Sequence, residues 1–202
     1  DTWDLSHQAK PDSANNPLSP GRVAKWKNPE GGYIHAMHSA LWGDMHWIIT
    51  GKNTDGTLLY EGGWQNNRPS AMHPVFRMVE NIFEELDTPG EWFYNRKERK
   101  LYFIPESGTD LGSATVEIVR LRHLIEISGT RAKPARNIHL KGFVFRHAAR
   151  TFMDNREPLL RSDWTVYRGG AILISGAEDC SIADCEFDQV GGNTIFINNY
   201  NR

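Results

Sequence analysis

In the C-terminal half of the chain, the hydrophobic positions come in short runs rich in β-branched residues. The runs cover residues 115–119, 124–127, 138–145, 171–174, 181–187 and 194–197. Gly, Asn and Asp separate them, and no segment between them shows the three-to-four residue spacing of an amphipathic helix. Strands without intervening helices argue against βαβ units, so this pattern predicts an all-β array.

Two of these runs repeat each other. Residues 137–145 and 179–187 align with apolar residues at the same places, and in both the alternation slips by one residue in the middle. The aligned pairs are Ile138 with Cys180, Leu140 with Ile182, Phe143 with Cys185 and Phe145 with Phe187. Ile-Ser-Gly stands upstream of each copy, at 127–129 and 174–176.

The slip is typical of a strand that bends at one residue and continues. Each copy therefore predicts a rung of three short strands, and stacking like residues over like gives a parallel β-solenoid. The copies are 42 residues apart, which fits a rung of about half that length plus an insertion. We assign the insertion to residues 151–170.

The N-terminal half has a different pattern of residue types. Residues 1–32 are rich in Asn, Pro and Ser and predict a loop-rich lead-in. Residues 33–50 are dense in His, Met and Trp, and their spacing fits a helix face or, for 45–50, a strand. Asp55 and Gly56 predict a hairpin turn.

Two further elements are predicted before the repeats. Residues 75–86 place apolar side chains at helical spacing, with Glu80, Glu84 and Glu85 on a solvent-facing side, and predict one short helix. The aromatic runs 92–94 and 101–104 flank a charged turn and predict a β-hairpin. We therefore divide the chain into an irregular, aromatic-rich region, 1–112, inserted in or capping the solenoid, and solenoid rungs, 113–202.

Composition narrows the function classes. With 23 Lys and Arg against 25 Asp and Glu, the chain has a net charge of −2, so it lacks the cationic surplus of a nucleic-acid binder. No apolar run reaches the length of a membrane span. Cys180 and Cys185 lack the partners of a zinc site and are interpreted as small buried side chains.

Several segments carry a family resemblance. Residues 79–93, followed by 101–105, resemble a segment near the start of right-handed parallel β-helix carbohydrate-active proteins, and 137–145 and 169–193 resemble their rungs. The chain is similar to glycoside hydrolase family 141, whose members include α-L-fucosidases and xylanases acting on plant cell-wall polysaccharide.

The resemblance implies a right-handed parallel β-helix, hydrolysis of a polysaccharide or oligosaccharide, no cofactor, and a secreted, periplasmic or cell-surface location. It also implies more rungs than 202 residues supply. We expect the remainder of the β-helix to cover the C-terminal end, because an uncapped rung exposes strand edges.

Glycoside hydrolysis uses two carboxyl groups, one as acid and one as base or nucleophile. Asp163 and Asp188 are the local catalytic candidates, and Asp154 is a weaker one. Carboxylates at such positions are most often solvated or turn-capping residues, which is the alternative interpretation. One or both catalytic carboxylates could also lie on rungs after Arg202.

Aromatic, amide and guanidinium groups near these acids suit sugar binding. The predicted substrate-binding residues are Trp164, Tyr167, Arg168, Asn193, Asn199, Asn201 and Arg202. For Asn193 and Asn198 the alternative is a structural ladder at the solenoid turns. His35, His38 and His46 are interpreted as packing or substrate contacts rather than metal ligands.

Two other functions remain open on the same fold. A polysaccharide lyase needs a basic side chain and commonly Ca²⁺, which Asp residues clustered on successive rungs would bind; the sequence shows no such cluster. A non-catalytic carbohydrate-binding solenoid would keep the aromatic and amide residues without needing any carboxylate.

Overall fold

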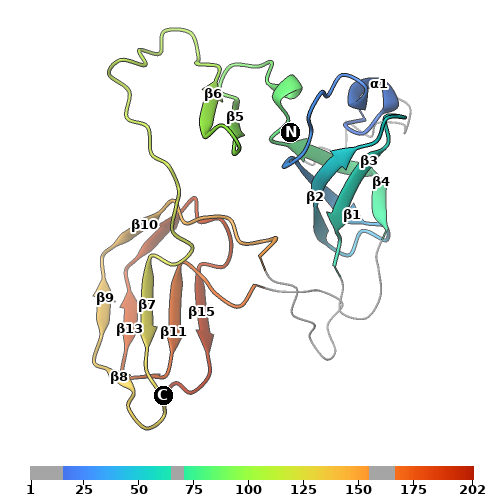
Figure 1. Cartoon of the computed structure of the whole chain (residues 1–202). Coiled ribbons are helices and arrows are strands. Elements are labelled where there is room, and N and C mark those ends of the chain that lie inside the picture. The colour runs from blue at the N-terminus through green and yellow to red at the C-terminus, as the bar shows by residue number, and fades with distance from the viewer. Residues whose placement is uncertain (1–15, 65–70, 155–166) are drawn as a thin grey trace. The chain divides into compact units, whose positions relative to one another are not determined.

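The protein is described here as a computed structural model covering residues 16–64, 71–154 and 167–202. The chain forms two compact units, Asp1–Thr115 and Val116–Arg202. Both are built mainly from β-strands, so the all-β prediction is confirmed (Figure 1). Each unit is described by itself below.

The first unit contains a four-stranded antiparallel sheet in the order β3-β2-β1-β4. Its strands are β1 (Tyr33–His38), β2 (Asp44–Lys52), β3 (Leu58–Gly62) and β4 (Met72–Glu80), and one short helix, α1 (Pro20–Val23), precedes them. The region is therefore an ordered sheet rather than the irregular segment that the sequence predicted.

One face of this sheet carries the core of the first unit. Ile34 on β1 and Ile49 on β2 are fully buried, and Trp47, opposite Ile34, is nearly so. Trp26, just after α1, is also fully buried. The alternation of apolar residues along β2 is thus the period of a half-buried strand, and the strand interpretation of 45–50 is confirmed.

The predicted helix over 75–86 is wrong. Its first half, residues 75–80, belongs to β4, which pairs with the free edge of β1 and places Tyr33 opposite Glu80 and Ile34 opposite Val79. A single 3-10 turn, η2 (Phe83–Glu85), follows. Apolar side chains on both faces of a strand imitate helical spacing over a short window, and edge pairing with β1 decides between the two structures.

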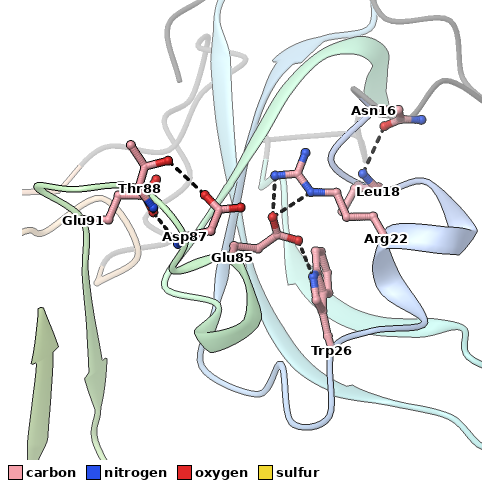
Figure 2. A network of polar contacts seen from close by, with 8 residues as sticks. All are labelled: Asn16, Leu18, Arg22, Trp26, Glu85, Asp87, Thr88 and Glu91. Atoms are coloured by element: carbon pink, nitrogen blue, oxygen red, sulfur yellow. Dashed lines mark hydrogen bonds and ion pairs between the residues drawn. The ribbon is translucent and has the colours of Figure 1, made fainter. Parts of the chain in front are cut away.

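The glutamates of this segment are held by partners rather than solvated. Figure 2 shows Glu85 accepting hydrogen bonds from Arg22 Nε (2.8 Å) and Trp26 Nε1 (2.6 Å). Glu84 accepts from the backbone N–H of Lys27, and Glu80 lies 2.9 Å from His35 Nε2. Burial alone would raise the pKa of Glu85, but the hydrogen bonds from Arg22 and Trp26 leave it below its ordinary value.

Both predicted hairpins are confirmed. β2 and β3 pair antiparallel across the turn at Asp55 and Gly56, where Gly56 adopts a positive φ of 89°. β5 (Trp92–Asn95) and β6 (Lys100–Phe103) pair in register from Trp92 opposite Phe103 to Asn95 opposite Lys100.

The second unit is a stack of parallel strands in three layers (Figure 1). We define them as the first layer, residues 125–147, the second, 172–189, and the third, 195–202. The strands are β7 (Ile125–Ser128), β8 (Ala135–Arg136), β9 (His139–Lys141) and β10 (Val144–Arg146) in the first layer, β11 (Ile172–Ser175), β12 (Ala177–Glu178), β13 (Ser181–Ala183) and β14 (Glu186–Asp188) in the second, and β15 (Ile195–Asn198) in the third.

The predicted register is confirmed wherever the layers pair. Leu140 lies opposite Ile182 and Phe145 opposite Phe187, as the repeat required. Ile127 lies opposite Ile174, which in turn lies opposite Ile197. Matching residues of β11 and β15 are 23 positions apart, about half of the 42 that separate β9 from β13.

The bends also recur at the same places. Gly142 and Asp184, which separate the last two strands of their layers, both adopt positive φ, at 72° and 50°. Asn137 and Asp179 do the same one strand earlier. A left-handed residue turns the chain through a corner within one position, and this accounts for the slip in the alternation.

The core of the second unit consists of residues that repeat from layer to layer. Ile127, Ile172, Ile174, Phe145 and Ala177 are its buried members, with Leu140 and Ile182 packed against them. The predicted strand at 115–119 is wrong: these residues form no strand, because no strand among the described residues pairs with them to satisfy their backbone groups.

The stacked core predicts that replacing two isoleucines of adjacent layers by alanine lowers the free energy of unfolding by unequal amounts. Ile172 is fully buried between Ile125 and Ile195, whereas Ile197 is 62% exposed. Ile172→Ala should lower the free energy of unfolding by about 2–5 kcal/mol, and Ile197→Ala by clearly less. Denaturant unfolding measures both, and equal losses would contradict the stacked core.

The Glu85 contacts predict a pH-dependent stability. Because the native pKa of Glu85 is lowered, its contribution is present above the ordinary carboxyl value and is lost as the pH falls through the native pKa. Glu85→Gln should cost about 1–2 kcal/mol at pH 7 and progressively less in acid. The control is Glu98→Gln, since within the described residues the Glu98 side chain makes only an exposed pair with Lys100. A pH-independent difference for Glu85→Gln would oppose this account.

Candidate functional site

Two groups of polar side chains stand out in the second unit. The first surrounds His123, which precedes β7. His123 Nδ1 lies 2.7 Å from the carbonyl oxygen of Gly170, and His123 Nε2 lies 3.1 Å from the hydroxyl of Tyr167. A carbonyl only accepts, so Nδ1 carries a hydrogen and donates to Gly170, and in that tautomer Nε2 accepts a hydrogen bond from the Tyr167 hydroxyl.

The surroundings of Tyr167 keep its hydroxyl protonated. Burial raises the pKa of Tyr167, and the negative charges of Asp154 and Glu126 raise it further, while Arg122 lowers it. Arg122 and Asp154 are themselves paired, with Nε 2.7 Å from Oδ2. Tyr167 can therefore donate a hydrogen bond to a ligand oxygen, or to His123, near neutral pH.

Asn193 and Gly169 complete this first group. The Asn193 side-chain amide donates to the carbonyl oxygens of Tyr167 and Gly169, both at 3.0 Å. A Cβ on Gly169 would lie 2.5 Å from His123 Cε1 and 2.6 Å from Tyr167 Cε1. Glycine is needed here so that the stacked rings of His123 and Tyr167, whose centroids are 6.0 Å apart, can approach the backbone.

The second group surrounds Glu178, the last residue of β12. The Glu178 side chain is only 10% exposed, which is unusual for a carboxylate. Arg136, the matching residue of the first layer, places Nε and Nη2 at 2.7 and 2.6 Å from Oε2, and the Tyr200 hydroxyl donates to Oε1. These contacts, that with Tyr200 foremost, lower the pKa of Glu178, and Glu178 in turn raises the pKa of Tyr200.

Two guanidinium groups flank this carboxylate and its tyrosine. The Arg131 guanidinium carbon lies 5.9 Å from the centre of the Tyr200 ring. Arg202 extends the third layer beside β12, with its N–H bonded to Ala177 and its carbonyl accepting from Asp179. Its positive charge contributes to the lowered pKa of Glu178 and offsets part of the rise in the pKa of Tyr200.

The predicted sugar-binding residues divide between these groups. Tyr167 and Asn193 belong to the first, and the exposed Arg168 follows Tyr167 in the chain. The other three, Asn199, Asn201 and Arg202, come after β15, at the opposite end of the strand from Asn193. Asn199 donates to Ser175 Oγ at 2.8 Å, and Asn201 bridges Ala177 N–H and the Asn198 carbonyl.

The two carboxylate candidates among the described residues have different partners. Asp188 ends β14 and accepts from Arg146 Nε of the first layer at 2.9 Å. Asp154 pairs with Arg122 and contributes to the first group. Asp163 and Trp164 lie outside the described residues.

His35, His38 and His46, the histidines considered in the sequence, lie on β1 and β2 and pack within the sheet. His35 and His38 are buried, and the rings of His35 and His46 meet edge to face, with centroids 4.9 Å apart. Burial, followed by the charge of His35, lowers the pKa of His46 to about 4. Over the described part of the chain, no three His, Cys, Asp or Glu side chains gather in a way that could hold a metal ion.

Sequence reasoning missed His123, Arg136 and Glu178. One signal was present: the first layer carries basic residues that are each followed by an acidic residue 42 or 43 positions later. Three such pairs form, Arg136 with Glu178, Lys141 with Asp184 and Arg146 with Asp188. No comparable signal marks His123, because its partners come from an insertion that interrupts the repeat.

Comparisons with known proteins support the fold. No protein-family model matches the sequence, and neither does any curated protein. A solved structure titled "Glycoside hydrolase" superposes with a TM-score of 0.63 at 19% sequence identity. The match covers 85% of this chain but 35% of that one, so the chain spans about a third of its length. The protein thus shares the fold of part of a glycoside hydrolase.

Among the described residues, no helix is long and apolar enough to cross a bilayer.

The close approach at Gly169 predicts the effect of a single methyl group. Gly169→Ala should displace the His123 and Tyr167 rings and lower the free energy of unfolding by about 1–3 kcal/mol, the usual cost of overpacking. The His123 ring signals in an NMR spectrum should shift at the same time. Gly21→Ala is the control, because a Cβ there meets nothing within 4 Å; an unchanged His123 signal in Gly169→Ala would contradict the contact.

Proposed function

We propose that the second unit is a segment of a right-handed parallel β-helix and that the protein hydrolyses glycosidic bonds in a complex polysaccharide of the plant cell-wall type. The observation that carries the proposal is the in-register stacking of short parallel strands over an isoleucine core. The shared fold with a protein titled "Glycoside hydrolase" supports it. Such a substrate also favours a secreted, periplasmic or cell-surface location.

The proposed chemistry uses two carboxyl groups on either side of the scissile bond. One donates a proton to the leaving oxygen while the other, as an anion, activates water or attacks the anomeric carbon. The ion pair with Arg146 suits Asp188 to the anionic role, which leaves Asp163 as the proposed acid. The reaction needs no cofactor.

Sugar binding is assigned to the residues around the two polar groups. Hydroxyl, amide and guanidinium groups bond sugar oxygens, and aromatic rings cover the apolar face of a pyranose. We propose this role for Trp164, Tyr167, Arg168, Asn193, Asn199, Asn201 and Arg202. In Asn193 and Asn201 it is combined with a structural one, because their amides also bond the backbone.

One observation favours a polysaccharide lyase as the second candidate. Lyases remove a proton beside a carboxylate and expel the neighbouring sugar, so they need a proton-transferring group near a cation. Tyr167 hydrogen-bonded to His123, with Arg122 acting electrostatically on Tyr167, provides such a set.

Substitution of the two aspartates tests the hydrolase. Asp163→Asn and Asp188→Asn in the intact protein should each lower the release of reducing ends from plant polysaccharide by at least about 100-fold, the usual contribution of general acid–base groups. Asp184→Asn is the matched control, since Asp184 is an exposed acid of the same layer, 3.5 Å from Lys141.

The alternatives give different outcomes in the same assay. Wild-type rates in both variants would remove the catalytic assignment. Products with an unsaturated sugar end, detected by ultraviolet absorbance and lost in Tyr167→Phe, would establish the lyase instead. Binding without cleavage by the unaltered protein would show a carbohydrate-binding module.

A further inference from the structure

The group around Glu178 contains more positive charge than its carboxylate requires. Both Glu178 oxygens already have donors, Arg136 on Oε2 and the Tyr200 hydroxyl on Oε1. Within the described residues, the side chains of Arg131 and Arg202 form no ion pair, yet both are exposed beside Tyr200 or Glu178. The group therefore presents two guanidinium groups to solvent next to a tyrosine.

Added residues at one corner of the stack build this arrangement. Six residues, Gly129 to Pro134, join β7 to β8 in the first layer, whereas only Gly176 joins β11 to β12 in the second. The longer turn brings Arg131 to the Tyr200 ring.

The third layer is also longer at this corner. Matching residues of β11 and β15 are 23 positions apart, but Arg202, whose N–H bonds Ala177, lies beside Glu178, 24 positions earlier. The added position lies near Asn199, which has a φ of 57°, and Tyr200, whose hydroxyl reaches Glu178. In stacked folds, insertions gather on the face that binds a partner.

We propose that Arg131, Arg202 and Tyr200 form a binding subsite for a sugar that carries a carboxylate, a uronic acid unit of an acidic polysaccharide. A guanidinium group forms paired, charge-assisted hydrogen bonds with a carboxylate. The Tyr200 ring offers a surface for the apolar face of the sugar.

Arg136 and Glu178 position the residues of this subsite and do not themselves contact the sugar. Arg136 belongs to the first layer and Glu178 to the second, and their pairing fixes the height of Glu178 in the stack. Glu178 then orients Tyr200 through its hydroxyl. Because Arg136 and Tyr200 occupy the Glu178 oxygens, the exposed guanidinium groups remain available for a ligand.

This inference rests on the proposed function only for the polysaccharide nature of the ligand, so its test measures binding without turnover. The probe is trigalacturonic acid, titrated calorimetrically into the protein, with the neutral trisaccharide galactotriose as the comparison. The acidic probe should bind at least tenfold more tightly than the neutral one, and its affinity should fall as salt is added.

Variants locate the site. Arg131→Gln and Arg202→Gln should each weaken binding of trigalacturonic acid by about tenfold or more, in line with the loss of a charged hydrogen bond. Lys133→Gln, which removes one positive charge from the same turn, should leave the affinity within about twofold. Matching circular dichroism spectra and melting temperatures establish that each variant is folded.

Three results would overturn the subsite. These are equal binding of the acidic and neutral probes, an equal loss in Lys133→Gln, and binding of a sulfated oligosaccharide but not of trigalacturonic acid. If the hydrolase assay fails while trigalacturonic acid binds through Arg131 and Arg202, only the proposed reaction is lost. If hydrolysis proceeds and this binding is absent, only the subsite is lost.

Discussion

Parallel pairing in register is the constraint on which the second unit depends. Each strand satisfies its backbone groups through the layer above or below it, so a residue in one layer fixes which residue lies over it in the next. The column Ile125–Ile172–Ile195 is the apolar result of that rule. Burial of like side chains over like supplies the stabilisation, since apolar area removed from water is the main favourable term in folding.

The same constraint explains where the chain is free to vary. Corners made by left-handed residues, such as Gly142 and Asp184, must recur in every layer because the strands on both sides are paired. Turns outside the ladder carry no such requirement. The six residues before β8 and the insertion after the first layer are therefore the places where polar groups gather around Tyr200 and His123.

The repeat in the sequence predicted most of the second unit because stacking makes structure periodic. Ile-Ser-Gly at 127–129 and 174–176 was enough to place β7 beside β11. The first unit has no repeat, and there the spacing of Val75, Met78 and Val79 was read as helical. What decided otherwise is pairing with the edge of β1, where Met78 lies opposite His35, 43 residues earlier, a feature that no local pattern contains.

The polar groups were predictable only in part, for a related reason. Tyr167 and Asn193 were identified by residue type, but the orientation of Tyr167 depends on His123, 44 residues earlier in the chain. No local pattern distinguishes Glu178 from a surface acid, because its hydroxyl donor Tyr200 comes from a layer of different length. Side-chain chemistry can be read from sequence, whereas partners brought together by insertions of unequal length cannot.

The pairing of a basic first layer with an acidic second layer has a consequence for assembly. Arg136 and Arg146 each have an opposite charge directly above them, and Lys141 has one a position further along. Two copies of the first layer placed together would instead bring like charges together at all three positions. The apolar core residues are nearly the same in both layers, so they would tolerate the pairing of two copies of the first layer. The charged residues thus distinguish one layer from the next, which the hydrophobic residues do not. They disfavour pairing between the same layer of two chains during folding.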